Sequence, residues 1–156
     1  MLEIEKLNQL QFECNECSQC CSGSSGFILL TKEDIENMAG FLEMSETDFL
    51  ENYTHIVKLK EEKFLSIKEK IRVVNKQKLF DCIFLENKRC LIYEVRPLQC
   101  QTYPFWPRII RSSYAWKKEG EFCPGINQGK KVNIKKIEKY ILDQRKANWL
   151  RSKHIS

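Results

Sequence analysis

The number and spacing of the cysteines constrain this 156-residue chain more than any other feature of its sequence. An even number of cysteines in a secreted chain would predict disulfides. Residues 1–6 contain early acidic side chains and no apolar run, so they do not resemble a signal peptide. We therefore expect a cytoplasmic protein, in which thiols stay reduced and serve as metal ligands. The eight candidate ligands are Cys14, Cys17, Cys20 and Cys21 in the run CxxCxxCC, followed by Cys82, Cys90, Cys100 and Cys123.

The CxxCxxCC run is the most specific motif in the chain. Thiolates bind zinc, iron–sulfur clusters and copper(I), and close spacing lowers the entropy lost when a site closes. The first three cysteines are spaced like those of a ferredoxin-type cluster, and Cys123-Pro124 has the form of the fourth ligand. Cys21 breaks that pattern, because the ferredoxin spacing has no further cysteine next to the third one. In an extended chain, the neighbouring side chains of Cys20 and Cys21 would also point in opposite directions. One of Cys20 and Cys21 is therefore expected to serve a second site or to pack.

A second motif surrounds Cys100. Pro97 suits the first position of a helix, which would place Cys100 in the first turn, where free amide groups favour the thiolate. Arg96 stands beside this turn and could either offset the charge of several thiolates or hold a loop through a salt bridge. Tyr93 could wall the metal site with an apolar ring or belong to the core. Arg96 and Tyr93 are therefore our candidate cofactor-contacting residues.

The remaining patterns predict an α+β fold of short elements. Residues 31–39 and 45–53 each begin with a hydroxyl side chain followed three residues later by an acid, a signature of helix starts, and Gly40 is expected to end the first helix. Apolar residues three to four positions apart predict an amphipathic basic helix at about 132–151. Alternating polarity favours antiparallel strands between residues 55 and 80. Short strands are expected at 27–30 and, as arms of a hairpin, at 82–85 and 90–93.

The charge is unevenly distributed along the chain. Residues 1–62 carry 13 acidic and 4 basic side chains, whereas residues 63–156 carry 8 acidic and 22 basic ones. The basic half leaves room for an acidic protein partner, but it lacks a recognisable nucleic-acid motif, so we favour a solvated basic helix. No stretch approaches the roughly 20 apolar residues that a membrane-spanning helix needs. No phosphate loop, HExxH motif or Ser/His/Asp set occurs, so no catalytic residue is assigned.

The order of these motifs resembles the YkgJ-like cysteine-cluster family, described as zinc- or iron-chelating proteins. The resemblance covers about residues 12–125 and implies that all eight cysteines are ligands. Tyr93, Arg96, Pro97 and Pro104 match the family's second signature, while Ser18-Gln19 departs from its usual small residue. Flagellin lysine methylases look like distant relatives with an iron–sulfur cluster in such a domain. This chain is much shorter and shows no clear methyl-donor pocket, so their activity is not carried over.

Together, these features predict one small α+β domain over residues 1–156, with short helices and antiparallel strands organised around a cysteine-ligated metal site. The expected function is binding of zinc or an iron–sulfur cluster, and the methylase resemblance favours a 4Fe–4S cluster. An iron–sulfur enzyme or electron carrier is the main alternative. An adaptor for an acidic partner or a nucleic acid ranks last.

Overall fold

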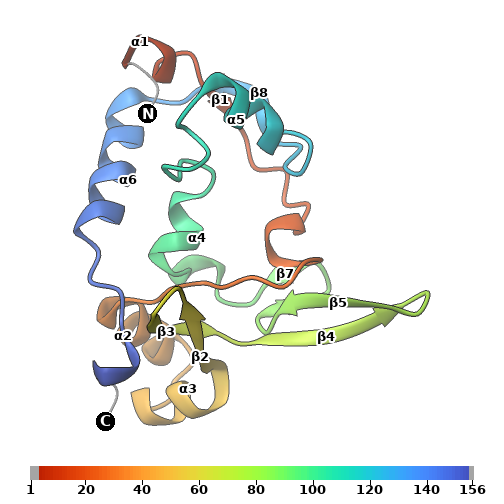
Figure 1. Cartoon of the computed structure of the whole chain (residues 1–156), viewed down its shortest axis with the longest axis vertical. Helices are drawn as coiled ribbons and strands as arrows, with labels where there is room; N and C mark the ends of the chain where they lie inside the picture. Colours follow the sequence, from red (N-terminus) through yellow and green to blue (C-terminus); the bar gives the residue numbers. More distant parts are fainter. Residues whose placement is uncertain (1–3, 155–156) are drawn as a thin grey trace. The chain divides into compact units, whose positions relative to one another are not determined.

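The computed structural model describes residues 4–154 and has the predicted α+β class (Figure 1). Its helices are α1 (Ile4–Leu7), α2 (Lys32–Phe41), α3 (Glu46–Tyr53), α4 (Leu98–Thr102), α5 (Ser113–Glu119) and α6 (Ile134–Lys146). Three 3-10 helices are η1 (Gln19–Cys21), η2 (Tyr93–Val95) and η3 (Ser152–His154). The strands form four antiparallel pairs: β1 (Gln11–Phe12) with β8 (Ile126–Lys131), β2 (Thr54–Leu59) with β3 (Glu62–Ile67), β4 (Glu69–Val74) with β5 (Gln77–Cys82), and β6 (Leu85–Glu86) with β7 (Arg89–Cys90).

The chain divides into two compact units, each with its own hydrophobic core. As far as the structure describes them, the first unit comprises residues 4–20 and 102–146, and the second comprises residues 21–101 and 147–154. One boundary falls between the adjacent residues Cys20 and Cys21. That the whole chain behaves as a single domain stays a prediction. No helix formed by residues 4–154 has the length and apolar character needed to cross a bilayer.

The first unit is centred on aromatic and branched side chains. Phe105 is 2% exposed and stacks on Trp116, with ring centroids 5.7 Å apart. Ile137 and Ile141 of α6 are buried in the same core, as the helical spacing predicts. The predicted end of this helix at residue 151 is wrong, because α6 ends at Lys146. Beyond it the backbone of Leu150 leaves helical pairing and bonds within the second unit, to Leu30 and Leu65.

The second unit begins with the two capped helices that the sequence predicts. Thr31 and Asp34 form a capping box at the start of α2, and Ser45 accepts a hydrogen bond from the Asp48 amide at the start of α3. Gly40 does not end the first helix, which continues to Phe41. The two helices contribute Ile35, Met38, Ala39 and Phe49 to the core of this unit.

Residues 27–30 do not form the predicted strand. The backbone makes an isolated bridge between Leu29 and Ser66, and the Leu30 carbonyl accepts a hydrogen bond from the Leu150 amide (2.8 Å). Instead, the Gln99 side chain accepts a hydrogen bond from the Leu29 amide (2.9 Å) and donates one to the Phe27 carbonyl (3.0 Å). The side-chain amide of Gln99 thus makes the hydrogen bonds that a neighbouring strand would make. Alternating polarity in the sequence does not reveal such a side-chain partner.

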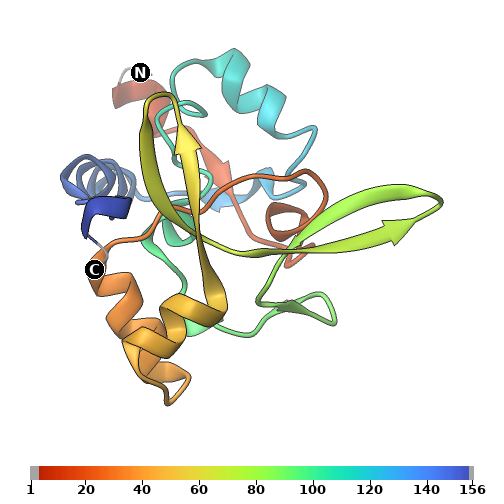
Figure 2. The same cartoon turned by 60° about the horizontal axis from the view of Figure 1, so that its bottom comes forward.

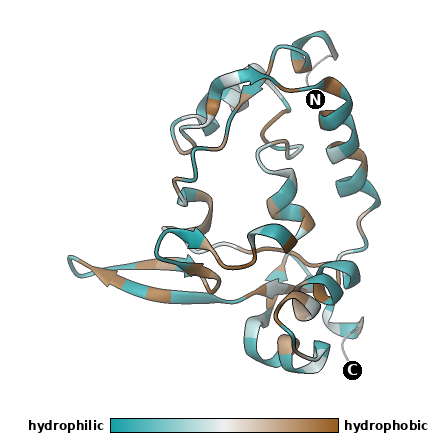
Figure 3. Cartoon of the chain, turned by 180° about the vertical axis from the view of Figure 1, so that it is seen from behind, coloured by the Kyte–Doolittle hydropathy of each residue, from teal (hydrophilic) through white to brown (hydrophobic). Residues whose placement is uncertain are grey.

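Three hairpins, β2–β3, β4–β5 and β6–β7, form most of the rest of the second unit. Figure 2 shows β4 and β5 as a long two-stranded ribbon, and Figure 3 shows hydrophobic and hydrophilic residues alternating along it. Ile71 and Val73 on β4 are 61% and 65% exposed. The predicted hairpin at 82–93 exists but is shorter, since only Leu85–Cys90 and Glu86–Arg89 pair, and residues 93–95 form η2 rather than strand.

Candidate metal centre

The eight cysteines are divided equally between the two units. All of them carry thiols rather than disulfides in the structure. Cys14 and Cys20 are exposed, Cys123 is 9% exposed, and the other five are partly buried. The first unit holds Cys14, Cys17, Cys20 and Cys123, and the second holds Cys21, Cys82, Cys90 and Cys100. We describe each group within its own unit.

In the first unit, antiparallel pairing carries the start of the cysteine run toward Cys123. Phe12 of β1 pairs with Ile126 of β8, and the Glu13 amide donates a hydrogen bond to the Gly125 carbonyl (3.1 Å). A Cβ atom on Gly125 would lie 2.4 Å from the Glu13 carbonyl oxygen, so this approach requires glycine. Cys14 directly follows Glu13, and Cys123 lies two residues before Gly125. The pairing therefore brings the start of the cysteine run toward Cys123.

The thiol of Cys123 is held in a defined polar environment. Burial raises its pKa, while hydrogen bonds from the Gly125 amide and with the Tyr103 hydroxyl act in the opposite direction. Cys17 and Cys20 lie close enough that their charges also raise the pKa of Cys123. Three thiols from sequence positions 17, 20 and 123 therefore interact electrostatically. A cation bound near Cys123 would favour the thiolate form of this residue.

Tyr103 connects Cys123 to a carboxylate. Its hydroxyl donates a hydrogen bond to Glu119 (2.9 Å), and Arg108 lies 3.7 Å from the same carboxylate. Burial, together with the charges of Cys123 and Glu119, raises the pKa of Tyr103 well above its usual range. The hydroxyl therefore stays protonated and keeps its role as a hydrogen-bond donor. No motif in the sequence marks Tyr103 as a polar partner of Cys123, so this role is a finding of the structure.

In the second unit, three cysteines sit at the ends of short elements. Cys82 is the last residue of β5 and Cys90 the last of β7, and both pack against the core. Cys100 lies in the first turn of α4, as predicted, although Pro97 precedes the helix rather than opening it. The Leu98 amide at the start of α4 donates a hydrogen bond to Asp34 (2.9 Å), which also caps α2. A single buried carboxylate thus joins the two helices.

Cys21 is followed by a segment fastened to the base of the β4–β5 ribbon. The Ser22 hydroxyl donates a hydrogen bond to Asp81 (2.5 Å), and the Arg72 guanidinium donates one to the same carboxylate (2.9 Å). Both hydrogen bonds lower the pKa of Asp81 below its usual value, and the one from Arg72 has the larger effect. The carboxylate therefore stays charged in a site where it is only 6% exposed.

Arg96 and Tyr93, the predicted cofactor-contacting pair, meet each other. The Arg96 guanidinium lies 3.9 Å from the centre of the Tyr93 ring, and its Nε atom donates a hydrogen bond to the Tyr93 carbonyl (3.0 Å). The contact with Tyr93 fixes the η2 turn that leads into α4. Contact of either residue with a cofactor stays a prediction.

The comparisons with known proteins bear on the whole cysteine region. Residues 13–124 match the family model described as "CxxCxxCC: Putative zinc- or iron-chelating domain". The chain belongs to this CxxCxxCC family. It is also 30% identical over 101 residues to an uncharacterized protein, MJ0661, of Methanocaldococcus jannaschii, an alignment that covers 64% of this chain and 47% of that protein. The chain thus spans about half the length of this relative. No solved structure matches it.

The metal-capable side chains that the structure describes in this CxxCxxCC protein are not assembled into a ready site. Within residues 4–154, no group of three or more His, Cys, Asp or Glu side chains is already arranged to hold a metal ion. The donor set nevertheless fits a soft metal, because it consists of reduced thiols, and the one most buried is hydrogen-bonded at its sulfur. Roles for the individual cysteines therefore stay predictions.

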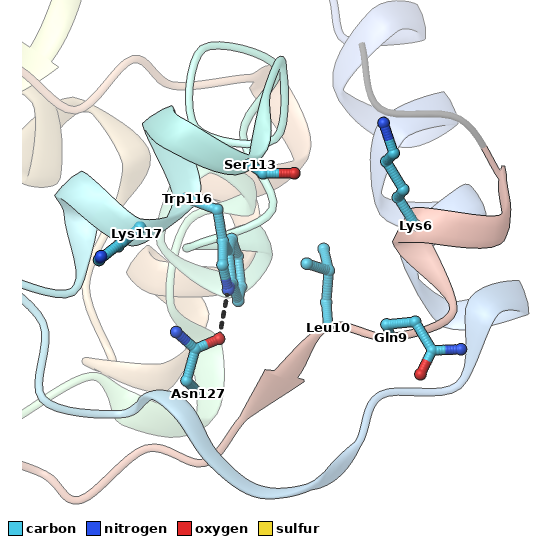
Figure 4. Close-up of a pocket in the computed structure, with 7 residues that line it drawn as sticks. All are labelled: Lys6, Gln9, Leu10, Ser113, Trp116, Lys117 and Asn127. Atoms are coloured by element: carbon cyan, nitrogen blue, oxygen red, sulfur yellow. Dashed lines mark hydrogen bonds between the residues drawn. The ribbon is translucent and has the colours of Figure 1, made fainter.

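A cavity elsewhere in the first unit of this CxxCxxCC protein has a different chemistry. It measures about 300 Å³ and is lined by Lys6, Gln9, Leu10, Ser113, Trp116, Lys117 and Asn127 (Figure 4). The Trp116 indole donates a hydrogen bond to the Asn127 side chain (2.9 Å) at its wall. No cysteine lines this cavity, so it is separate from the candidate ligands.

Proposed function

We propose that this chain binds a metal through cysteine thiolates in a reducing compartment such as the cytoplasm, and that the bound group is a 4Fe–4S cluster or zinc. The observation that carries the proposal is the pairing of β1 with β8, in which the Glu13 amide next to Cys14 bonds the Gly125 carbonyl, two residues from Cys123 and more than a hundred residues further along the chain. Neutral thiols gain little from this proximity, and thiolates without a cation would repel one another. A bound cation turns the same arrangement into a stabilising one.

Three residues around Cys123 suit it for this role. The Gly125 amide can donate to a charged sulfur, the Tyr103 hydroxyl contacts the same sulfur, and Glu119 accepts the hydrogen bond of the tyrosine and so fixes the ring. Such outer contacts orient a ligand and tune the metal that it holds. Zinc would supply a structural crosslink, which in small peptides contributes about 10–16 kcal/mol at neutral pH. An iron–sulfur cluster would supply electron transfer.

The spacing of the ligands favours the cluster over zinc. Cys14, Cys17 and Cys20 with Cys123-Pro124 reproduce the order of a ferredoxin-type set, and all four cysteines belong to the first unit. Zinc is the second candidate, because isolated pairs of cysteines also suit tetrahedral coordination. The same purification distinguishes the two groups.

The test is anaerobic purification followed by elemental analysis and a visible spectrum. We expect a brown protein with iron and sulfide in equal amounts, or else a colourless one with stoichiometric zinc. Cys17→Ser and Cys123→Ser should each reduce bound metal at least several-fold, whereas the matched control Ser18→Ala in the same loop should not. Metal content that is unchanged in both cysteine variants would refute their role as ligands.

A further inference from the structure

The segment that follows the cysteine run lies antiparallel to β5. The Phe80 amide donates a hydrogen bond to the Gly23 carbonyl (2.8 Å), and the Ser22 hydroxyl bonds the Asp81 side chain. Residue numbers therefore rise on one chain as they fall on the other. The next pair in this register is Cys21 with Cys82, which lie 61 residues apart in the sequence.

The contact between Ser22 and Asp81 brings the two neighbouring cysteines near each other. Cys21 directly precedes Ser22, and Cys82 directly follows Asp81, so the hydrogen bond between the serine hydroxyl and the carboxylate (2.5 Å) limits how far apart the two cysteines can lie. Cys21 is the last residue of η1, so it lies where the cysteine run ends and the fastened segment begins.

The contacts that maintain this register are strong ones. The Asp81 carboxylate is buried and accepts hydrogen bonds from Ser22 and from the Arg72 guanidinium, which also reaches the Ser22 hydroxyl at 3.3 Å. Glu69, the residue paired with Cys82 across the β4–β5 ladder, accepts hydrogen bonds from the Ser25 hydroxyl and the Gly26 amide, both at 2.7 Å. The segment is thus fastened at Asp81, the residue before Cys82, and at Glu69, the residue that pairs with Cys82 on β4.

We propose that the Ser22–Asp81–Arg72 clamp holds Cys21 opposite Cys82, so that these two thiolates serve one metal centre. Asp81 and Ser22 are positioning residues in this arrangement and do not bind the metal themselves. The proposal rests on the metal-binding function proposed above and assigns a partner to the cysteine that breaks the ferredoxin pattern. It also separates the roles of the adjacent residues Cys20 and Cys21, since Cys20 belongs to the first unit and Cys21 to the second.

The register is tested in metal-free, reduced full-length protein with a short reagent that bridges two thiols. After trypsin digestion, Cys82 is the only cysteine in peptide 79–88, and the whole CxxCxxCC run lies in peptide 7–32. We expect a bridge between these peptides that survives Cys20→Ser and falls at least fivefold in Cys21→Ser. The opposite result, or no bridge between the two peptides, would overturn the register.

The clamp is tested by removing one hydroxyl at a time. Ser22→Ala leaves the Arg72–Asp81 pair in place and should lower the yield of the bridge at least threefold. The matched control Ser25→Ala removes an equivalent hydroxyl–carboxylate bond further from Cys21 and should change the yield less than twofold. Circular dichroism checks that both variants fold. Equal yields in the two variants would show that Ser22 does not position Cys21.

The shared metal is tested by comparing single and double variants. Cys21→Ser and Cys82→Ser should each remove the same metal equivalent, and the double variant should lose no more than either. Additive losses would place the two thiolates in different centres and overturn the proposal. A protein that forms the bridge but binds no metal would refute the proposed function and with it the shared centre. Loss of the bridge with metal binding intact would refute this inference alone.

Discussion

Gly125 is a residue at which the first unit leaves no room for a side chain. Its backbone lies so close to Glu13 that an added Cβ would overlap a carbonyl oxygen at 2.4 Å. We expect Gly125→Ala to lower the free energy of unfolding by about 1–3 kcal/mol, a typical result of overpacking, and to reduce bound metal as β1 and β8 separate. Urea denaturation and elemental analysis measure the two effects.

The matched control for this residue is Gly40 in α2. No atom lies within 4 Å of the Cβ that alanine would add there. Because glycine is a poor residue for a helix interior, Gly40→Ala should raise the free energy of unfolding by about 0.5–1 kcal/mol and leave metal content unchanged. A stability loss in Gly40→Ala as large as that in Gly125→Ala would contradict the steric explanation.

The thiols themselves should differ in reactivity. Only the thiolate reacts with alkylating reagents, and a raised pKa lowers its fraction at a given pH. Burial raises the pKa of Cys123, whereas Cys14 is exposed. In metal-free protein at pH 8 we expect iodoacetamide to modify Cys123 several-fold more slowly than Cys14, and the difference to narrow as the pH rises. Mass spectrometry of tryptic peptides measures both rates, and equal rates would contradict the buried environment of Cys123.

At the scale of elements, Asp34 joins α2 to α4, the helix that carries Cys100. Thr31→Ala removes only the cap of α2 and should lower the free energy of unfolding by about 1 kcal/mol. Asp34→Ala also removes the hydrogen bond to the Leu98 amide, so its loss should be about 2–3 kcal/mol. We expect lower metal affinity only in Asp34→Ala, because only this change loosens α4.

Ser45→Ala at the start of α3 is the control for a pure capping loss. The Ser45 hydroxyl accepts a hydrogen bond from the Asp48 amide (3.1 Å) at the start of α3. It should match Thr31→Ala in stability and leave metal binding unchanged. If Asp34→Ala behaves like these two variants in a metal titration, the proposed link between α2 and Cys100 is wrong.

At the scale of the whole molecule, the question is whether two cores unfold as one. Trp106 and Trp116 report on the first unit, and Trp149 lies in the second. In a Trp149→Phe variant, fluorescence therefore follows the first unit alone, while circular dichroism follows the entire chain. A single domain predicts coincident urea transitions by the two probes. Separate transitions would show that each unit is a domain.

Bound metal should shift the folding equilibrium toward the folded chain by mass action. A ligand that binds only the folded chain adds about 2.7 kcal/mol at a free concentration one hundredfold above its dissociation constant. We expect a chelator to lower the midpoint of unfolding of the metal-loaded protein and to have no effect on protein prepared without metal. A chelator that leaves the loaded protein unchanged would contradict a stabilising metal.

Local features of this protein were predictable from its sequence. The capped starts of α2 and α3, the buried stripe of α6 and the position of Cys100 in the first turn of α4 all depend on residues a few positions apart. Cysteine spacing likewise indicated the CxxCxxCC family, which the match over residues 13–124 confirms. Hydrogen bonds and periodic packing within one element determine such features, so they leave a direct trace in the sequence.

Contacts between distant segments were decided only by the tertiary structure. The backbone of Glu13 approaches Gly125, and the Ser22 hydroxyl bonds Asp81, 59 residues further along the chain. The Gln99 side chain bonds the Phe27 carbonyl, 72 residues earlier in the chain. None of these partners is marked by a local pattern, because each pairing depends on how the intervening chain packs. The sequence by itself determined the cysteine content and spacing that place this protein in the CxxCxxCC family. Packing decided in which of the two units each cysteine lies.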